Sequence, residues 1–236
     1  GHPRLVSQGW RWCVMPVVWE QSRAAGKSAV KCAICVPTSD NSTTIQWAFR
    51  LARLISEAGG PVALVAMKGT PIDVARNTLV RMALESNAEW VFFLDADTIP
   101  DDGVLARLLS RGLPMVSGVY YAKKYEGCWP AAWVKEGGVY KPLSDENKGL
   151  VMADAVGCGC MLVHSSVFRK IPPPWFKWET NTYSPDGKLM EKGCSEDFYM
   201  VAKAKEHGIQ ALVDFDCRCD HIGAFKIDMT GKVRLL

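Results

Sequence analysis

A run of five bulky apolar residues that ends on two acids constrains the fold of this chain more than any other stretch. Residues 90–94 read Trp-Val-Phe-Phe-Leu, and the chain continues as Asp95-Ala96-Asp97-Thr98. Such a run predicts a strand that is buried on both faces, as in a parallel sheet with helices on either side. Open α/β sheets bind ligands at the carboxyl ends of their strands, so the two acids are expected at a ligand site.

Two interpretations of these acids follow from the residues themselves. Side chains alternate along an extended strand, so Asp95 and Asp97 would point the same way and offer paired oxygen ligands to a divalent cation on a phosphorylated substrate. Alternatively, Asp95 simply ends the strand, while Asp97 and Thr98 cap a helix that begins near Pro100. The motif alone leaves both interpretations open.

The pattern around this run predicts a Rossmann-like wound sheet. Four strands with three intervening helices fit into about 90 residues, an alternation typical of α/β folds, and 236 residues suit one such domain. The expected strands are 29–36, 61–67, 90–94 and 113–120. The expected helices are 43–58, a second that begins at Pro71, and 100–110.

Two of these helices carry more specific predictions. In the first, Thr43 with Gln46 forms an expected capping box. Its expected buried stripe is Ile45, Phe49, Ala52 and Ile55. In the second, Thr70 with Asp73 forms another expected capping box, and the apolar stripe is Ile72, Leu79 and Ala83.

Arg76 lies on the same face of the second helix as its apolar stripe. A guanidinium group in such a place is costly unless a carboxylate or a phosphate pairs with it. Arg76 is therefore expected either to meet a bound phosphate group or to form a salt bridge with Asp95 or another acid at the edge of the core.

The second half of the chain has shorter and less regular elements. A hairpin is expected from 129–134 and 138–141, followed by short strands at 150–155 and 159–164. Residues 172–192 are rich in proline and aromatic residues without a period, and we interpret them as a mobile lid over a cleft. Ser195 is expected to cap a helix from 196 to about 207, and a strand at 210–215 precedes Asp220-His221.

Composition excludes several classes of protein. With 48% hydrophobic and 22% charged residues the chain is globular, and its net charge of +3 is too small to indicate a nucleic-acid surface. No apolar stretch approaches the ~18 residues of a membrane span. The nine cysteines lack zinc-ribbon spacing and suggest buried thiols in a reducing compartment such as the cytoplasm. Residues 1–28 form an expected N-terminal extension whose tryptophans could attach the chain peripherally to a membrane.

Six short motifs, in this order and spacing, carry a resemblance to a known family. They are Pro37–Asp40, Ala75–Asn77, Phe93–Asp97, Gly157–Met161, Ser195–Asp197 and Asp220–His221. The chain resembles the nucleotide-sugar-dependent glycosyltransferases of GT-A fold, most of all the family-2-like enzymes. The resemblance implies a single GT-A domain over residues 29–236. Its nucleotide-binding half would be 29–120, and its acceptor-binding half, with a smaller C-terminal subregion, 121–236.

The resemblance also implies substrates and a metal ion. The donor would be a nucleoside diphosphate sugar of UDP or GDP type, and the acceptor a carbohydrate or another hydroxyl compound. Asp95 and Asp97 match an Asp-x-Asp motif that holds a divalent cation on the diphosphate, and His221 matches a further metal ligand. Imidazole suits manganese better than magnesium, so Mn²⁺ is the expected ion. The oligomeric state is not predicted.

The remaining roles are implied in the same way. Asp197 matches the acid that takes the proton of the acceptor hydroxyl in inverting enzymes, and Glu196 would contact the acceptor or the donor sugar. The helix dipole alone could explain both acids, and it would lower the pKa of Asp197 unless burial offsets it. Some enzymes of similar fold retain the configuration of the transferred sugar, so a retaining GT-A enzyme is one alternative to the inverting one. The implied nucleotide-binding residues are Thr38, Ser39, Asp40, Arg76, Asp95 and Ala96.

Other functions stay open at this point. A magnesium-dependent phosphatase of haloacid-dehalogenase type would use Asp95 as nucleophile, with Asp214 and Asp216 completing a metal site, but its motif normally opens the chain. A sugar nucleotidyltransferase is disfavoured because a glycine-rich basic loop after the first strand is absent. A carbohydrate-binding domain without catalysis would use tryptophans as stacking platforms, namely Trp129, Trp133, Trp175 and Trp178.

Overall fold

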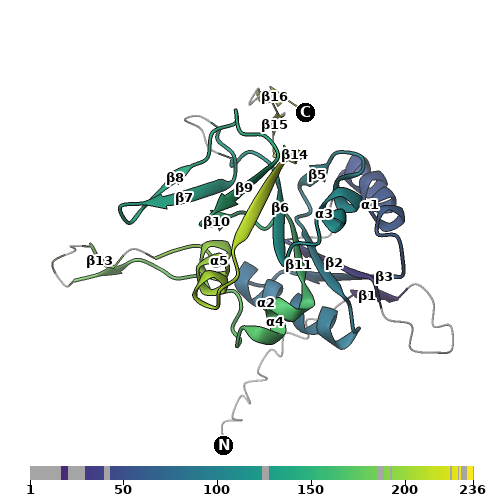
Figure 1. The fold of residues 1–236 in the computed structure, drawn as a ribbon, viewed down its shortest axis with the longest axis horizontal. Helices are drawn as coiled ribbons and strands as arrows, with labels where there is room; N and C mark the ends of the chain where they lie inside the picture. The colour runs from purple at the N-terminus through teal and green to yellow at the C-terminus, as the bar shows by residue number, and fades with distance from the viewer. Residues whose placement is uncertain are drawn as a thin grey trace, which may run out of the picture.

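The computed structural model shows an α/β arrangement in which helices cover both faces of one large mixed sheet (Figure 1). None of its described helices has the length and apolar character that crossing a bilayer requires. The described residues are 17–20, 30–39, 43–123, 128–184, 186, 189–191, 193–223, 225–227, 229 and 233–235.

Most strands in the centre of the large sheet point the same way. These parallel strands are β2 (Cys32–Thr38), β3 (Val62–Lys68), β4 (Trp90–Leu94), β6 (Met115–Val119) and β14 (Ala211–Ile222). One strand, β11 (Cys160–His164), lies between β4 and β6 and runs in the opposite direction. The order β3-β2-β4-β11-β6-β14 confirms the prediction of a mixed α/β fold with a mostly parallel sheet.

Shorter antiparallel strands extend this sheet. One of them, β1, pairs with β3, although it falls in the expected N-terminal extension. β14 has 12 residues, so it continues past the expected end at Phe215 and carries Asp220 and His221 within the strand. The added strands are β1 (Val17–Glu20), β5 (Thr98–Pro100), β9 (Leu150–Ala153), β15 (Phe225–Ile227) and β16 (Val233–Leu235).

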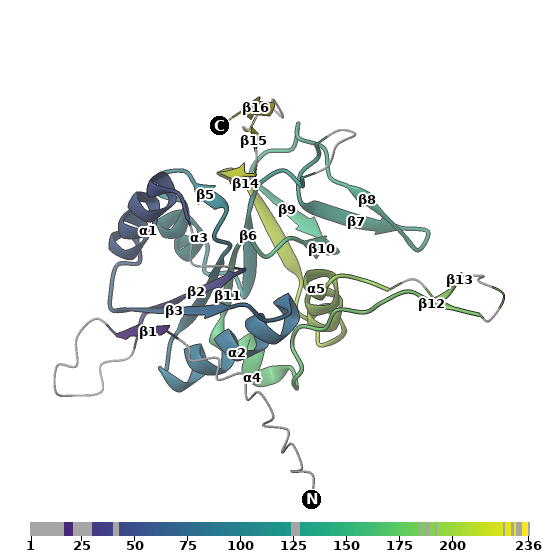
Figure 2. The ribbon, with the colours of Figure 1, turned by 180° about the vertical axis from the view of Figure 1, so that it is seen from behind.

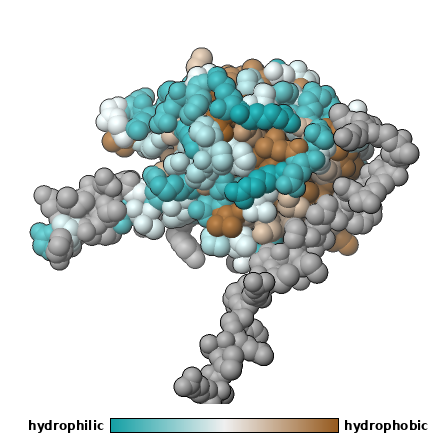
Figure 3. Space-filling model, turned by 90° about the horizontal axis from the view of Figure 1, so that it is seen from below, coloured by the Kyte–Doolittle hydropathy of each residue, from teal (hydrophilic) through white to brown (hydrophobic). Residues whose placement is uncertain are grey.

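The helices divide between the two faces of the sheet, as the views from the front and from behind show (Figures 1 and 2). On one face, the buried side chains of α1 (Ile45–Glu57) and α3 (Val104–Ser110) form one apolar cluster with the sheet. On the other face lie α2 (Ile72–Glu85), α4 (Ser165–Lys170) and α5 (Glu196–Glu206), which form a second cluster. Seen from the side of α2, α4 and α5, the surface is largely hydrophilic, with apolar residues gathered in patches (Figure 3).

The strand β4 contributes to both clusters, as the sequence predicted. Val91 and Phe93 pack in the cluster with α2, whereas Phe92 and Leu94 pack in the cluster with α1. All four side chains have no exposed surface. Burying a large apolar side chain of this kind contributes about 1.5–3 kcal/mol, so β4 is a main source of the stability of the sheet.

The buried face of α1 differs from the prediction. Thr44, not Thr43, caps the helix, because its hydroxyl accepts a hydrogen bond from the backbone N–H of Trp47 at 3.1 Å. Trp47 is buried, whereas Ile45 and Phe49 are 75% and 67% exposed. The expected stripe was therefore wrong at Ile45, Phe49 and Ala52, since the helix turns Trp47 toward the sheet, whereas Ile55 packs against the core cluster as predicted.

The starts of the next two helices also differ from the predictions. Pro71 caps α2 without a side-chain hydrogen bond, and Asp73 accepts instead from the backbone N–H groups of Val74 and Trp178. The capping box of Thr70 with Asp73 is thus not formed. The third helix begins at Val104, not at Pro100, because residues 98–100 form β5 and pair with β14.

The second half of the chain contains the expected hairpin, which projects from the main sheet (Figure 1). It forms a small sheet with the order β10-β7-β8. Further along the chain, two short strands pair with each other. The strands of these two sheets are β7 (Ala132–Glu136), β8 (Val139–Pro142), β10 (Ala155–Val156), β12 (Thr182–Tyr183) and β13 (Leu189–Glu191).

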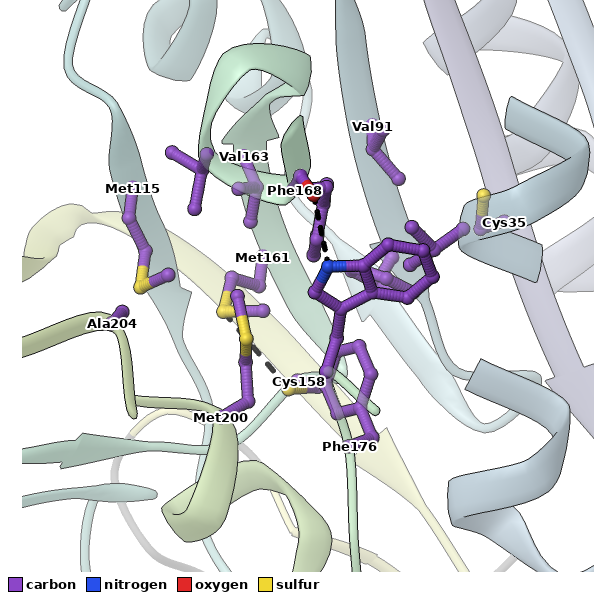
Figure 4. Packing of buried hydrophobic residues seen from close by; sticks show 14 of the residues in the cluster. Cys35, Val91, Met115, Cys158, Met161, Val163, Phe168, Phe176, Met200 and Ala204 are labelled. Carbon is purple, nitrogen blue, oxygen red and sulfur yellow. Dashed lines mark hydrogen bonds between the residues drawn. The ribbon is translucent and has the colours of Figure 1, made fainter. Parts of the chain in front are cut away.

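The beginning of the expected lid is part of the core. Trp175 and Phe176 are buried, and their backbone N–H groups donate to Asn77 Oδ1 at 2.9 and 3.2 Å. Phe176 belongs to the same buried cluster as Phe168 and Met200, between the sheet and the helices (Figure 4). Hydrogen bonds and burial therefore fix this segment, and the prediction of a mobile lid was wrong for its first part.

Candidate functional site

A pocket of about 420 Å³ opens where β2 and β4 end and α2 begins. It brings together four of the predicted nucleotide-binding residues, Thr38, Ser39, Asp95 and Ala96. Asp40, which was also predicted, lies outside the described residues. The residues that line the pocket are Pro37, Thr38, Ser39, Thr70, Ile72, Ala75, Asp95, Ala96 and Asp97.

The two acids of the pocket stand on a turn and not on an extended strand. β4 ends at Leu94, and the backbone N–H of Thr98 donates to the carbonyl of Asp95 at 3.0 Å. The alternation argument for paired acids was therefore wrong, and the two carboxylates have different partners. α1 supports the turn, because Trp47 Nε1 donates to the carbonyl of Asp95 at 3.0 Å.

Arg76 joins two acids that are far apart in the sequence. Its Nη2 is 2.9 Å from Asp95 Oδ1, and its Nε is 3.1 Å from Glu196 Oε1. The residue is only 3% exposed. Burial alone would lower the pKa of Arg76, but Asp95 and other nearby acidic groups raise it overall, so the group stays charged. The expected salt bridge to Asp95 is confirmed, and Glu196 is a second partner that the sequence did not reveal.

Asp197 lies at the start of α5, next to this ion cluster. Its Oδ1 accepts hydrogen bonds from the backbone N–H of Phe198, at 2.8 Å, and from the hydroxyl of Ser195. Burial raises the pKa of Asp197 although these donors and Arg76 oppose the shift. Burial thus offsets the helix dipole, which was the condition for this acid to be a useful base.

Glu196 is less exposed than its neighbour Asp197. It is 5% exposed, and the pKa of its carboxyl is raised, first by burial and then by the charge of Asp197. Its contact with Arg76 occupies Oε1. The predicted contact of Glu196 with a sugar stays a prediction, and in this structure the residue positions Arg76.

Asp97, the second acid of the pocket, pairs with two basic side chains, Lys123 and His221. Lys123 Nζ is 2.6 Å from Oδ2, and His221 Nε2 is 3.5 Å from Oδ1. Burial opposes the charge of Asp97, but the hydrogen bonds from His221 and Lys123 lower its pKa to about 2. Asp97 is therefore ionised over the whole physiological range.

Two neighbouring tyrosines, Tyr120 and Tyr121, fix the orientation of the His221 ring. Its Nδ1 is 2.8 Å from the carbonyl oxygen of Tyr121, and its ring contacts the ring of Tyr120 edge-on with centroids 5.1 Å apart. A carbonyl can only accept, so Nδ1 carries a proton, and Nε2 is the ring nitrogen that faces Asp97. Metal-binding histidines are commonly held by such a carbonyl.

The site offers some, but not all, of the ligands that a divalent cation needs. Within the described ranges, no group of three His, Cys, Asp or Glu side chains is arranged to hold a metal ion. Asp97 Oδ1 and His221 Nε2 nevertheless face each other at 3.5 Å, so that either a proton or a cation can lie between these two ligand atoms. Asp95 is engaged by Arg76. A cation here would have two protein ligands and take its others from the substrate, while Asp95 as a ligand stays a prediction.

The sequence analysis did not identify Lys123 as a residue of this site, because Lys123 belongs to no recognisable motif. The glycines of the Gly157–Met161 motif turn out to serve packing, because a Cβ on Gly157 would lie 2.1 Å from the hydroxyl of Tyr120. That hydroxyl accepts a hydrogen bond from the backbone N–H of Gly159 at 3.0 Å. Two glycines separated by a single residue, Gly157 and Gly159, are the sequence signal for this tight packing.

Comparison with known proteins gives a likeness in fold. No known family profile and no curated protein sequence matches the chain. Among solved structures, A197 from STIV matches with a TM-score of 0.58 and 16% identity, over 87% of this chain and 94% of that one. At this identity the likeness shows a shared fold and no more.

Two further matches are weaker. A UDP-glucose pyrophosphorylase complexed with UDP-glucose has a TM-score of 0.43 and 9% identity, over 81% of this chain and 93% of that one. A glycosyltransferase involved in the glycosylation of the major capsid of PBCV-1 has a TM-score of 0.31 and 12% identity, over 58% and 62%. Neither likeness is strong enough to argue from.

Proposed function

We propose that this protein is a metal-dependent glycosyltransferase that moves a sugar from a nucleoside diphosphate sugar to a hydroxyl acceptor with inversion. The observation that carries the proposal is the link from Asp95 through Arg76 to Glu196, beside Asp197. It joins a pocket at the strand ends, which suits a nucleotide, to the half-buried acid Asp197, which suits a base. The donor would carry UDP or GDP.

The pocket side of the site would bind the donor. Thr38 and Ser39 line the pocket at the end of β2, where the nucleoside would lie. Transfer of the sugar leaves negative charge on the departing diphosphate. A divalent cation held by Asp97 and His221, with Mn²⁺ favoured by the imidazole, would neutralise part of that charge.

The other side of the site would activate the acceptor. The two donors on Oδ1 hold the Asp197 carboxylate in place, and we assign Oδ2 as the atom that takes the proton of the attacking hydroxyl. The raised pKa of Asp197 brings its basicity closer to neutral pH, where general bases work best. The hydroxyl oxygen then forms a bond to the anomeric carbon as the bond to the diphosphate breaks, which inverts the configuration.

The phosphatase alternative fits the contacts less well. Its nucleophile, Asp95, would have to attack while its carboxylate is bound by Arg76 at 2.9 Å. The acid expected to complete its magnesium site, Asp214, is fully buried and is bound by Arg111 at 2.8 Å. The carboxylates of Asp95 and Asp214 thus each form an ion pair with an arginine.

The substitution Asp197→Asn tests the proposal. It keeps the shape of the side chain but removes the base, and loss of a general base typically costs about 10²- to 10⁴-fold in rate. Release of UDP or GDP from UDP-sugars and GDP-sugars in the presence of Mn²⁺ would be measured, with nucleotide affinity expected to stay near that of the wild type. Asp154→Asn is the matched control, because Asp154 pairs with Lys205.

The pH dependence of the rate provides a second readout. Asp197 must be ionised to act, and its pKa is raised, so the rate should rise with pH through a value above the ordinary 3.8 of an aspartate. Asp97, with a pKa of about 2, cannot produce this limb. An unchanged rate in Asp197→Asn would remove Asp197 from the role of base, and products of retained configuration would point to the retaining alternative.

A further inference from the structure

The carboxylate of Asp97 already has a positive partner from the protein itself. Lys123 Nζ is 2.6 Å from Asp97 Oδ2, so the two groups form a short, charge-assisted hydrogen bond. In the part of the chain that the structure describes, Lys123 and His221 are the basic residues paired with Asp97. An ammonium group on Oδ2 and a divalent cation at the same carboxylate would repel each other, so the two compete for this site.

Hydrogen bonds fix the backbone just before Lys123. Ala122 donates its backbone N–H to the carbonyl of Trp129 at 2.9 Å, and Tyr121 forms an isolated bridge with Pro130. The same Tyr121 carbonyl holds His221. Lys123 therefore starts two residues from the group that orients His221, and its long stem leads to the edge of the pocket.

The ion pair itself is easy to break. The side chains of Lys123 and Asp97 are 31% and 47% exposed, and ion pairs that water reaches in this way contribute little to stability. Lysine carries its charge on a flexible four-carbon stem, so the ammonium can reach other partners near its first one. The departing diphosphate of a donor held at Asp97 would be such a partner.

We propose that Lys123 serves as a built-in cation of the donor site: its ammonium pairs with Asp97 while the donor is absent, and moves to the diphosphate of the donor when a divalent cation binds Asp97. Lys123 is thereby a donor-binding residue that also competes with the free metal ion. This inference rests on the proposed function, and it adds a residue that no motif of the sequence indicated.

Replacement of Lys123 tests this directly, because two affinities should change in opposite directions. In Lys123→Ala, free Mn²⁺ should bind the nucleotide-free protein up to about fivefold more tightly, since its competitor is gone. Binding of UDP or GDP at saturating Mn²⁺ should weaken by about tenfold, since a charged hydrogen bond to the diphosphate is lost. Electron paramagnetic resonance of free Mn²⁺ and calorimetric titration of each nucleotide measure the two effects.

Two further variants make the result specific. Lys123→Arg keeps the charge and should bind the nucleotide nearly as the wild type does. Lys141→Ala removes an exposed lysine with an ion pair of the same 2.6 Å length to Glu136, and it should change neither affinity.

Each other outcome contradicts a stated part of the inference. If Lys123→Ala weakens nucleotide binding without tightening Mn²⁺ binding, Lys123 does not compete at Asp97. If it tightens Mn²⁺ binding alone, the ammonium does not move to the diphosphate. If the wild type binds Mn²⁺ and a nucleotide and Lys123→Ala behaves identically, the inference fails while the proposed function stands. A wild type that binds neither overturns both.

Discussion

Arg76 is the residue on which the geometry of the site depends most. Its two acidic partners come from the end of β4 and the start of α5, and Glu196 is 120 residues away in the sequence. The guanidinium group also lies over the rings of Phe93 and Phe176, at 5.7 and 6.0 Å from their centroids. A charged group in apolar surroundings is tolerated here because both of its ion pairs are formed.

Loss of Arg76 should therefore destabilise the fold strongly. Arg76→Ala leaves Asp95 and Glu196 without their partner, and breaking a buried ion pair from one side typically costs about 3–5 kcal/mol. Urea unfolding would measure the change. Arg53→Ala is the matched control, because Arg53 is 65% exposed in its pair with Asp102 and its loss should leave the stability nearly unchanged. Equal effects of the two substitutions would contradict this account of Arg76.

At the residue scale, the sequence could predict which chemical groups matter but not all of their partners. The apolar stripe around Arg76 indicated that an acid must pair with it, and Asp95 does. The contacts of Glu196 with Arg76 and of Lys123 with Asp97 were not predicted, because each joins two segments whose relative placement no local pattern specifies. The direction of the Asp97 side chain was predicted wrongly for a local reason. The prediction assumed the alternation of an extended strand, but the chain turns after Leu94.

At the scale of elements, α1 shows how a correct helix can have the wrong face. Its expected and observed spans agree closely, but the cap is Thr44 and the buried residues are Trp47 and Leu54. Successive residues of a helix are about 100° apart, so a small error in phase exchanges the inner and outer faces. Both Ile45-Phe49 and Trp47-Leu54 are apolar, so hydrophobicity alone could not decide between them.

Two substitutions in α1 test the observed face. Leu54 is fully buried, and Leu54→Ala should lower the free energy of unfolding by about 2–5 kcal/mol through lost contacts and a cavity. Phe49 is 67% exposed, and Phe49→Ser should change it by no more than about 0.5 kcal/mol. Thermal or urea unfolding of both variants measures this. A larger effect at Phe49 than at Leu54 would mean that the predicted stripe, not the observed one, faces the sheet.

At the scale of the whole molecule, the sheet brings distant segments of the chain to one edge. β2 and β4 deliver the pocket residues, α2 delivers Arg76, and the far end of β14 returns His221 to Asp97. The parallel strands β2, β3, β4 and β6 could be predicted because each lies in a mainly apolar run. The antiparallel insertion of β11 and the length of β14 could not, since strand order depends on long-range pairing that leaves no local trace.

The central claim is that this site binds a nucleoside diphosphate together with a divalent cation. A thermal-shift titration with UDP and with GDP, each with and without Mn²⁺, tests it most directly. A ligand present at ~100-fold excess over its Kd stabilises the folded state by about 2.7 kcal/mol, a shift that is easily measured. We expect one nucleotide to stabilise the wild type only when Mn²⁺ is present, and Asp97→Ala to lose that response. Stabilisation by Mg²⁺ with a phosphate mimic, without a response to either nucleotide, would contradict the claim and favour the phosphatase.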